Sequence, residues 1–240
     1  MALTKSQQWF TDNVSENVKE LLEIGDLANR EIDDKISIGI GDPRTTFAIY
    51  SNIFNCICEE IRKYEEEGWT DFDLNIADRL HIGYTTTQCD DDEKAGNFMV
   101  YLQDPGITVS DDTVGDEANT DTIELCTSWN AANVHAQSDI LKAISASAKN
   151  SLSSIMNLKT ESSEFILPLF CIIHSSILKY IRLKRVELKQ DEYELNIAGL
   201  YTVGIREIAS DTNVEEETYY VPSISLKLFF KDDANATGRY

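Results

Sequence analysis

Residues 110–124 form an acidic stretch, SDDTVGDEANTDTIE, with six carboxylates and no lysine or arginine. Carboxylates at this density could bind Ca²⁺, which in an EF-hand loop takes oxygen ligands at positions 1, 3, 5 and 12 and needs glycine at position 6. With Gly115 at position 6, Val114 falls on a ligand position and Asp121 falls where a bidentate glutamate is needed. The stretch is therefore interpreted as a solvated connecting loop.

Three further segments also lack the full pattern of a ligand site. Residues 89–97, CDDDEKAGN, fail the calcium pattern at the fifth and sixth positions and are interpreted as a charged hairpin tip. Residues 39–44, GIGDPR, lack the third glycine and the G-K-[ST] of phosphate-binding loops. Cys171 and His174 lie three residues apart, but a structural zinc site needs four ligands. No cofactor or metal is therefore expected.

The residues that could perform catalysis do not form a known motif. The three histidines, His81, His135 and His174, lie outside the sequence patterns of hydrolases and metalloproteases. One enzyme hypothesis uses Asp71, Asp73 or His81, and it predicts a concave pocket with perturbed titrating groups around them. A turn rich in capping residues is the alternative interpretation. The chain is expected not to be an enzyme.

The formal net charge of −21 limits the partners that the chain can bind. Residues 1–120 hold 26 acids and 9 bases, a net charge of −17, whereas residues 121–240 hold 16 acids and 12 bases, a net charge of −4. Such a field repels nucleic acids and anionic membranes, and it attracts cations or a partner with a basic face. Solubility alone is the alternative explanation.

Cysteine usage and hydropathy indicate the compartment. The five cysteines are an odd number without the spacing of a secreted disulfide framework, and the first residues, MALTKSQQWF, lack a secretory apolar region. The apolar run within Phe165–Leu183 is uninterrupted only over 165–173, which is too short to span a bilayer. We therefore expect a buried helix there, no contact with membranes, and a location in a reducing cytoplasm.

A single stretch concentrates positive charge. Residues 179–189, KYIRLKRVELK, contain Lys179, Arg182, Lys184, Arg185 and Lys189. These cations can compensate the negative end of a helix dipole, which is the structural interpretation. The functional interpretation is that they dock against an acidic patch of another copy, a heterologous contact that can close into a ring. The candidate acidic partners are Glu59–Glu67, Asp90, Asp91, Asp92 and Glu93, and Asp111, Asp112, Asp116 and Glu117.

Hydrophobic periodicity predicts the elements that must position these residues. Helices are expected over Thr4–Ile32, where Thr4 and Gln7 have capping-box spacing, from Asp42-Pro43 to a left-handed Gly68, over Ala131–Met156 and over Ser163–Lys184. Strands are expected over Ile36–Gly41, Arg79–Gln88, Phe98–Gln103, Ile107–Val109, Thr122–Ser128, Val186–Ala198, Leu200–Ile208 and Thr218–Lys231. No internal repeat is evident.

This order predicts an α+β fold with a mainly antiparallel sheet of about six to eight strands packed with four helices, including a long N-terminal helix. Residues 1–240 are expected to form a single domain, with a subdivision near residues 110–121 as the alternative.

The absence of a catalytic motif, the uneven charge and regular structure at both chain ends favour a non-enzymatic assembly protein. We expect a ring or connector component of a virus-like particle of phage type, which binds itself and other assembly proteins through the acidic and basic patches. It would work in the host cytosol and then in the assembled particle. The alternative is an acidic mimic of nucleic acid that inhibits a nucleic-acid-binding protein, through Asp90–Glu93 and Asp111–Glu117.

Overall fold

Helices dominate the structure, a computed structural model that describes residues 3–69, 71–76, 80–88, 94–102, 122–155, 162–198, 201–209 and 214–222. The helices are α1 (Lys5–Asn13), α2 (Val18–Ile36), α3 (Pro43–Glu66), α4 (Thr122–Asn133), α5 (Ser138–Ile155) and α6 (Ile166–Leu188), with a short 3₁₀ turn, η2 (Ser163–Phe165), before α6. The strands are β1 (Asp71–Ile76), β2 (Leu80–Gln88), β3 (Lys94–Leu102), β4 (Glu192–Ile197), β5 (Tyr201–Ala209) and β6 (Val214–Pro222).

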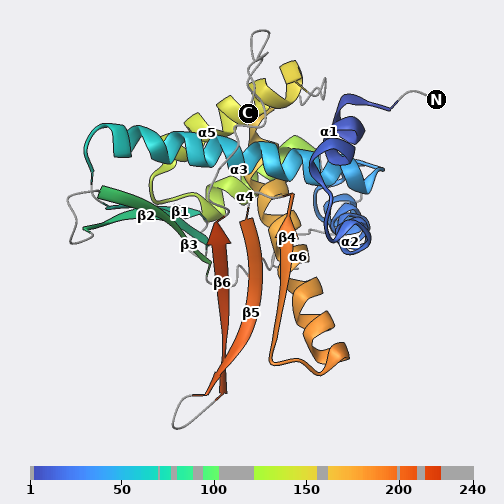
Figure 1. The fold of residues 1–240 in the computed structure, drawn as a ribbon. Helices are drawn as coiled ribbons and strands as arrows, with labels where there is room; N and C mark the ends of the chain where they lie inside the picture. The colour runs from blue at the N-terminus through green and yellow to red at the C-terminus, as the bar shows by residue number, and fades with distance from the viewer. Residues whose placement is uncertain are drawn as a thin grey trace.

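The chain builds the same unit twice. Three helices followed by three strands make up the first part, and three helices followed by three strands make up the second. In each unit the strands form a separate antiparallel sheet with its strands in sequence order, β1-β2-β3 and β4-β5-β6. Each sheet lies along the last helix of its own unit, the first along α3 and the second along α6 (Figure 1).

Matching residues recur at a spacing of 120 residues in the helices. Trp9, Asn13 and Val14 correspond to Trp129, Asn133 and Val134, and the amide of each asparagine donates to the carbonyl oxygen of its tryptophan at 2.7 Å. The first strands share the sequence Leu-Asn-Ile and the same burial pattern, with the leucine and isoleucine buried. An internal repeat is therefore present, and the expectation of none was wrong.

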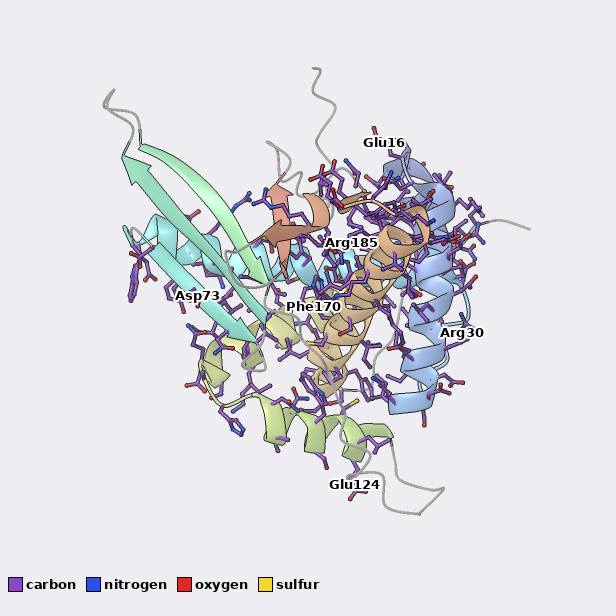
Figure 2. The ribbon with its side chains drawn as sticks, turned by 90° about the horizontal axis from the view of Figure 1, so that it is seen from below. Glu16, Arg30, Asp73, Glu124, Phe170 and Arg185 are labelled. Carbon is purple, nitrogen blue, oxygen red and sulfur yellow. The ribbon has the colours of Figure 1, made fainter. Side chains whose placement is uncertain are left out.

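The two units meet at the centre of the molecule through the equivalent helices α3 and α6. Tyr50 on α3 stacks on Phe170 on α6, with ring centroids 4.9 Å apart and an angle of 7° between the ring planes. Phe54 and His174 correspond to each other in the repeat, and Phe54 lies against Phe170 as His174 lies against Tyr50. Figure 2 shows Phe170 in the middle of the helices. Equivalent residues of the two units therefore make equivalent contacts at the centre.

A side chain of each unit also forms hydrogen bonds with the backbone of an edge strand of the other unit. The side chain of Gln137, before α5, accepts a hydrogen bond from the backbone N–H of Asn75 in β1 and donates one to the carbonyl oxygen of Asp73, both at 2.8 Å. Asn17, at the equivalent place before α2, accepts from the backbone N–H of Asn196 in β4 at 3.1 Å. Gln137 and Asn17 have the same left-handed backbone, with φ of 52° and 51°. These amides cover backbone groups that an edge strand leaves exposed.

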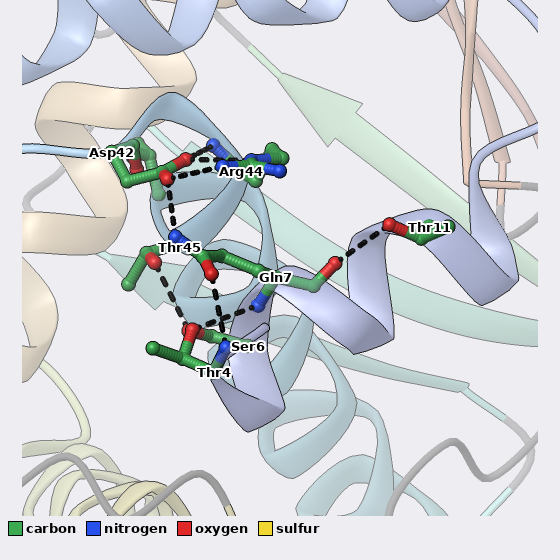
Figure 3. A network of polar contacts seen from close by, with 8 residues as sticks. Thr4, Ser6, Gln7, Thr11, Asp42, Arg44 and Thr45 are labelled. Atoms are coloured by element: carbon green, nitrogen blue, oxygen red, sulfur yellow. Dashed lines mark hydrogen bonds and ion pairs between the residues drawn. The ribbon is translucent and has the colours of Figure 1, made fainter. Parts of the chain in front are cut away.

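A polar network joins the N-terminus to the start of α3. Thr4 and Gln7 form the predicted capping box at the start of α1. The Gln7 amide then donates to Asp42 at 2.6 Å, and the Ser6 hydroxyl lies 3.0 Å from that of Thr45 (Figure 3). Hydrogen bonds from the side chain and the backbone of Arg44 lower the pKa of Asp42 to about 2. Asp42 therefore caps α3 as a carboxylate, as its place before Pro43 predicts.

The predicted fold class was wrong. The described residues form six helices and two small three-stranded sheets in place of four helices on one sheet of six to eight strands. The expected N-terminal helix is broken, because residues 14–17 are not helical and separate α1 from α2. Ile36–Gly41 is not a strand, and Thr122–Ser128 is helical within α4. Residues 107–109 lie outside the described residues.

Helix α6 is the core helix of the second unit. The segment Ser163–Leu188 is long and apolar enough to cross a membrane by length and composition, but 83% of its most apolar window is buried inside the fold. Burial of this extent is typical of a helix at the centre of a soluble protein. The apolar face of α6 is therefore buried against α2, α3 and β4.

Candidate functional site

The predicted basic patch on α6 is largely engaged within the chain. Lys179 pairs with Glu31 of α2 at 2.7 Å, and Lys184 pairs with Glu187 one turn further along α6 at 2.8 Å. Arg185 is buried, and its guanidinium lies 3.3 Å from the carboxylate of Glu207 in β5. Of the predicted contact residues on α6, Lys179 and Arg185 therefore join α6 to other elements of the same chain, and Lys184 forms its ion pair within α6.

The remaining predicted contact residues have other positions. Arg182 is half-buried on α6, and Lys189 is exposed with a left-handed backbone that ends the helix. Of the predicted acidic contact residues, Glu59–Glu67 lies at the end of α3 and in the turn after it, and Asp90, Asp91, Asp92, Glu93, Asp111, Asp112, Asp116 and Glu117 lie outside the described residues. A role for them in subunit contacts stays a prediction.

The residues of the enzyme hypothesis do not converge in the described part of the chain. Asp71 and Asp73 are exposed on the outer face of β1, whereas the alternate residues Leu74 and Ile76 face the core. Figure 2 shows Asp73 on the first sheet, away from the central helices. The backbone of His81 pairs with Asn75 in the sheet, and its side chain is outside the description. No cleft between the two carboxylates is therefore formed by the described residues.

His174 and Cys171 belong to the core. His174 is 1% exposed, its Nδ1 lies 2.8 Å from the Tyr50 hydroxyl, and burial lowers its pKa to about 3. Burial likewise raises the pKa of the Cys171 thiol to about 12. Among the residues that the structure describes, no three His, Cys, Asp or Glu side chains lie close enough to hold a metal ion. Cys171 and His174 are therefore packing residues.

An aromatic corner connects α3 to β1. Gly68 has φ of +90°, and the N–H of the next residue, Trp69, donates to the carbonyl oxygen of Tyr64 at 3.0 Å. This is the Schellman closure of a helix, in which an apolar contact accompanies the long hydrogen bond. The contact here is the edge of Trp69 against Tyr64, with centroids 5.8 Å apart and planes at 84°. The left-handed closure predicted at Gly68 is confirmed.

The corner exposes a large aromatic surface among carboxylates. Tyr64 stacks on Phe72 with centroids 4.1 Å apart and planes at 7°, and Trp69 stands at 84° to both rings. Trp69 is 53% exposed, although two of its ring contacts fix its orientation. The neighbouring carboxylates of Glu66 and Glu67 are exposed as well. The corner therefore presents a fixed indole to the solvent in a negatively charged setting.

The second unit contains the same corner without the exposed aromatic ring. Lys189 takes the left-handed position with φ of 54°, and the N–H of Gln190 donates to the carbonyl oxygen of Arg185 at 3.0 Å. The identical bonding makes Gln190 the counterpart of Trp69, and Arg185 the counterpart of Tyr64. Closure of the helix thus does not require a tryptophan, and the structural role of Trp69 does not explain its exposed ring.

The hypotheses drawn from the sequence assign no role to Trp69, which lies two residues before Asp71. The spacing of Tyr64, Trp69 and Phe72 around Gly68 indicates that these rings lie together, because a Schellman closure brings the residue after the glycine back onto the helix. What the sequence alone did not show was that the ring stays exposed. A large exposed aromatic side chain is typical of a protein-binding surface.

Comparisons with known proteins give no further guide to the site, because no family model, curated protein or solved structure matches this chain.

Proposed function

We propose that the protein is a non-enzymatic assembly component that binds a partner protein with a basic surface. The proposal rests on one observation: basic side chains of α6 are paired within the chain, whereas acidic side chains beside Trp69 are exposed. Lys179, Lys184 and Arg185 form ion pairs within the chain, whereas Glu66 and Glu67 beside the exposed Trp69 face the solvent. The surface offered to a partner is therefore acidic and partly aromatic.

This contrast changes the form of assembly that the charges favour. A ring of identical copies docked through Lys179–Lys189 would need those cations to face the neighbouring copy, and the ion pairs to Glu31 and Glu207 compete with that contact. A partner of different sequence that supplies the positive charge avoids the competition. It also relieves part of the self-repulsion that accompanies a net charge of −21. Membership of a virus-like particle, as one such assembly, stays part of the proposal.

The test is the composition and salt dependence of the native complex. The tagged full-length chain, isolated at about 0.1 M salt from the organism that encodes it, is expected to carry a second protein in fixed stoichiometry by native mass spectrometry. The complex is expected to dissociate at about 1 M salt, where the Debye length falls to about 3 Å. An isolated chain with no protein attached at either salt concentration overturns the proposal.

The same measurements separate the two other functions expected from the sequence. Closed rings of the purified chain alone, detected by mass photometry, would support self-assembly in place of a different partner. A complex whose partner is displaced by duplex DNA would support the mimicry of nucleic acid, because a mimic and DNA compete for one basic cleft.

A further inference from the structure

The geometry points to the aromatic corner of Tyr64, Trp69 and Phe72 as a subsite that binds an arginine or lysine side chain of the partner. This inference rests on the proposed function and names the residues that recognise the partner. Its first support is the ring of Trp69, which is 53% exposed while its edge contacts hold it at 84° to the Tyr64–Phe72 stack. A fixed ring loses little conformational entropy when a ligand covers it.

Charge complementarity selects the ligand. Glu66, Glu67, Asp71 and Asp73 lie within five residues of Trp69 along the chain, and all four side chains are exposed. An indole face attracts a cation through its quadrupole, and surrounding carboxylates add a long-range attraction of the same sign. An anionic or purely apolar ligand could contact the ring, but the surrounding carboxylates would not attract it. The corner therefore discriminates in favour of guanidinium and ammonium groups.

The second unit provides an internal comparison. At the equivalent corner, Gln190 replaces Trp69 and the buried Arg185 replaces Tyr64, so that position holds a cation of its own, paired with Glu207 at 3.3 Å. The two corners share their backbone bonding and differ in their side chains. Tyr64 and Trp69 are thus an addition to the repeated fold rather than a requirement of it, whereas Phe72 has an aromatic counterpart in Tyr193.

The direct test follows the indole of Trp69 during titration with a cationic peptide. The chain has three tryptophans, and Trp9 and Trp129 are buried, so the indole N–H signal of Trp69 is assigned by its loss in Trp69→Leu. Tri-arginine at low salt is expected to shift this signal and leave those of Trp9 and Trp129 in place. Tri-citrulline, which has nearly the same shape and no charge, is the control and is expected to cause no shift.

Variants separate the ring contact from general attraction between opposite charges. Trp69→Leu keeps an apolar side chain without a π face and is expected to weaken tri-arginine binding about two- to five-fold, the factor that corresponds to one exposed cation–π contact. Trp69→Phe is expected to retain part of the affinity. Leu188→Ala, at the equivalent corner of the second unit, is the matched control and is expected to bind as the unaltered chain does.

The outcomes distinguish this inference from the proposed function. Equal affinities for Trp69→Leu and the unaltered chain, together with a weaker Glu66→Gln/Glu67→Gln variant, mean diffuse attraction and overturn the subsite. If Trp69→Leu retains the native protein complex unchanged, the subsite is also overturned while the proposed function stands. If the unaltered chain carries no protein partner but its Trp69 signal responds to tri-arginine, the proposed function fails and the cation subsite stands.

Discussion

At the scale of single residues, the central polar pair breaks the symmetry of the repeat. The His174 ring and the Tyr50 hydroxyl meet at 2.8 Å in a core position where the equivalent residues, Phe54 and Phe170, are apolar. We expect His174→Phe to lower the free energy of unfolding by about 1–3 kcal/mol, because the buried Tyr50 hydroxyl loses its hydrogen bond with His174. Tyr50→Phe/His174→Phe should recover most of that loss. Urea denaturation of the unaltered chain, both single variants and the double variant measures these changes, and additive effects of the two substitutions would contradict the expectation.

The same histidine makes stability depend on pH. Burial lowers the pKa of His174 to about 3 in the folded protein, whereas a histidine in the unfolded chain titrates near 6.5. The unfolded state therefore binds the extra proton first, and this contribution to stability is lost as the pH falls from about 6.5 toward 3. Between pH 7 and pH 5 the loss should be about 2 kcal/mol.

A difference measurement isolates this effect from the titration of the carboxylates. The free energy of unfolding of the unaltered chain, minus that of Tyr50→Phe/His174→Phe, should fall by about 2 kcal/mol between pH 7 and pH 5. Protonation of surface carboxylates relieves repulsion in both proteins and cancels in the difference. A difference that does not change over this pH range would show that His174 does not carry the pH dependence.

At the scale of elements, the packing of α2 on α3 depends on one glycine. A Cβ atom added to Gly25 would lie 2.6 Å from the Cβ of Pro43 and 2.8 Å from its backbone Cα and carbonyl oxygen, and none of these atoms can rotate away. We expect Gly25→Ala to reduce the free energy of unfolding by about 1–3 kcal/mol through overpacking. Ser145→Ala, at the equivalent position of α5, is the control and should cost less. Thermal unfolding compares the two, and equal melting temperatures would contradict the expectation.

The hydrogen bonds between the Gln137 side chain and the backbone of β1 give a second prediction at this scale. Gln137→Ala removes the donor and the acceptor that cover the backbone of Asn75 and Asp73. Hydrogen exchange at the Asn75 amide is expected to accelerate about ten-fold, which corresponds to the loss of one hydrogen bond of about 1.4 kcal/mol. The exposed substitution Lys142→Ala on α5 is the control. An unchanged exchange rate of the Asn75 amide in Gln137→Ala would mean that the Gln137 hydrogen bonds do not stabilise the edge of the sheet.

The elements also show which parts of the fold the sequence could predict. Local signals succeeded: the capping box of Thr4, the Asp42-Pro43 start of α3 and the closure at Gly68 each depend on neighbouring residues. Signals that need tertiary context failed. The apolar period that joins α1 to α2 continues through residues 14–17, yet Asn17 adopts φ of 51° to reach β4 of the other unit. Short apolar runs such as Thr122–Ser128 fit a strand or a helix equally well.

The candidate site was less predictable than the fold. The basic residues of α6 were visible as a cluster, but their partners, Glu31 and Glu207, are distant in sequence and became apparent only in the structure. Trp69 is evident in the sequence, but the 53% exposure of its side chain became apparent only in the structure. The repeat is hard to predict from the sequence because identities such as Trp9/Trp129 and Asn13/Asn133 are few and widely spaced.

At the scale of the whole molecule, the two units pack against each other. The packing pairs that cross between units, α2 with α6 and α3 with α5, occur in equivalent forms, and β3 and β6 also lie together. Two further kinds of contact join the units: the stack of Tyr50 on Phe170, and the hydrogen bonds of the Gln137 and Asn17 side chains to the edge strands β1 and β4. Each unit therefore buries part of its apolar surface against the other. The expectation of a single domain over residues 1–240 can be tested on this basis.

The test divides the chain inside the acidic stretch, after Gly115, and expresses residues 1–115 and 116–240 separately. Neither fragment should unfold cooperatively alone, because each would expose the apolar face of α3 or α6. Mixed or co-expressed, the fragments should form a 1:1 complex with a cooperative transition, measured by native mass spectrometry and circular dichroism. Tyr50→Ala in the first fragment should weaken this association strongly, since it removes the central aromatic stack. A fragment that folds cooperatively as a monomer would instead make each unit a domain of its own, with the acidic stretch as the linker between them.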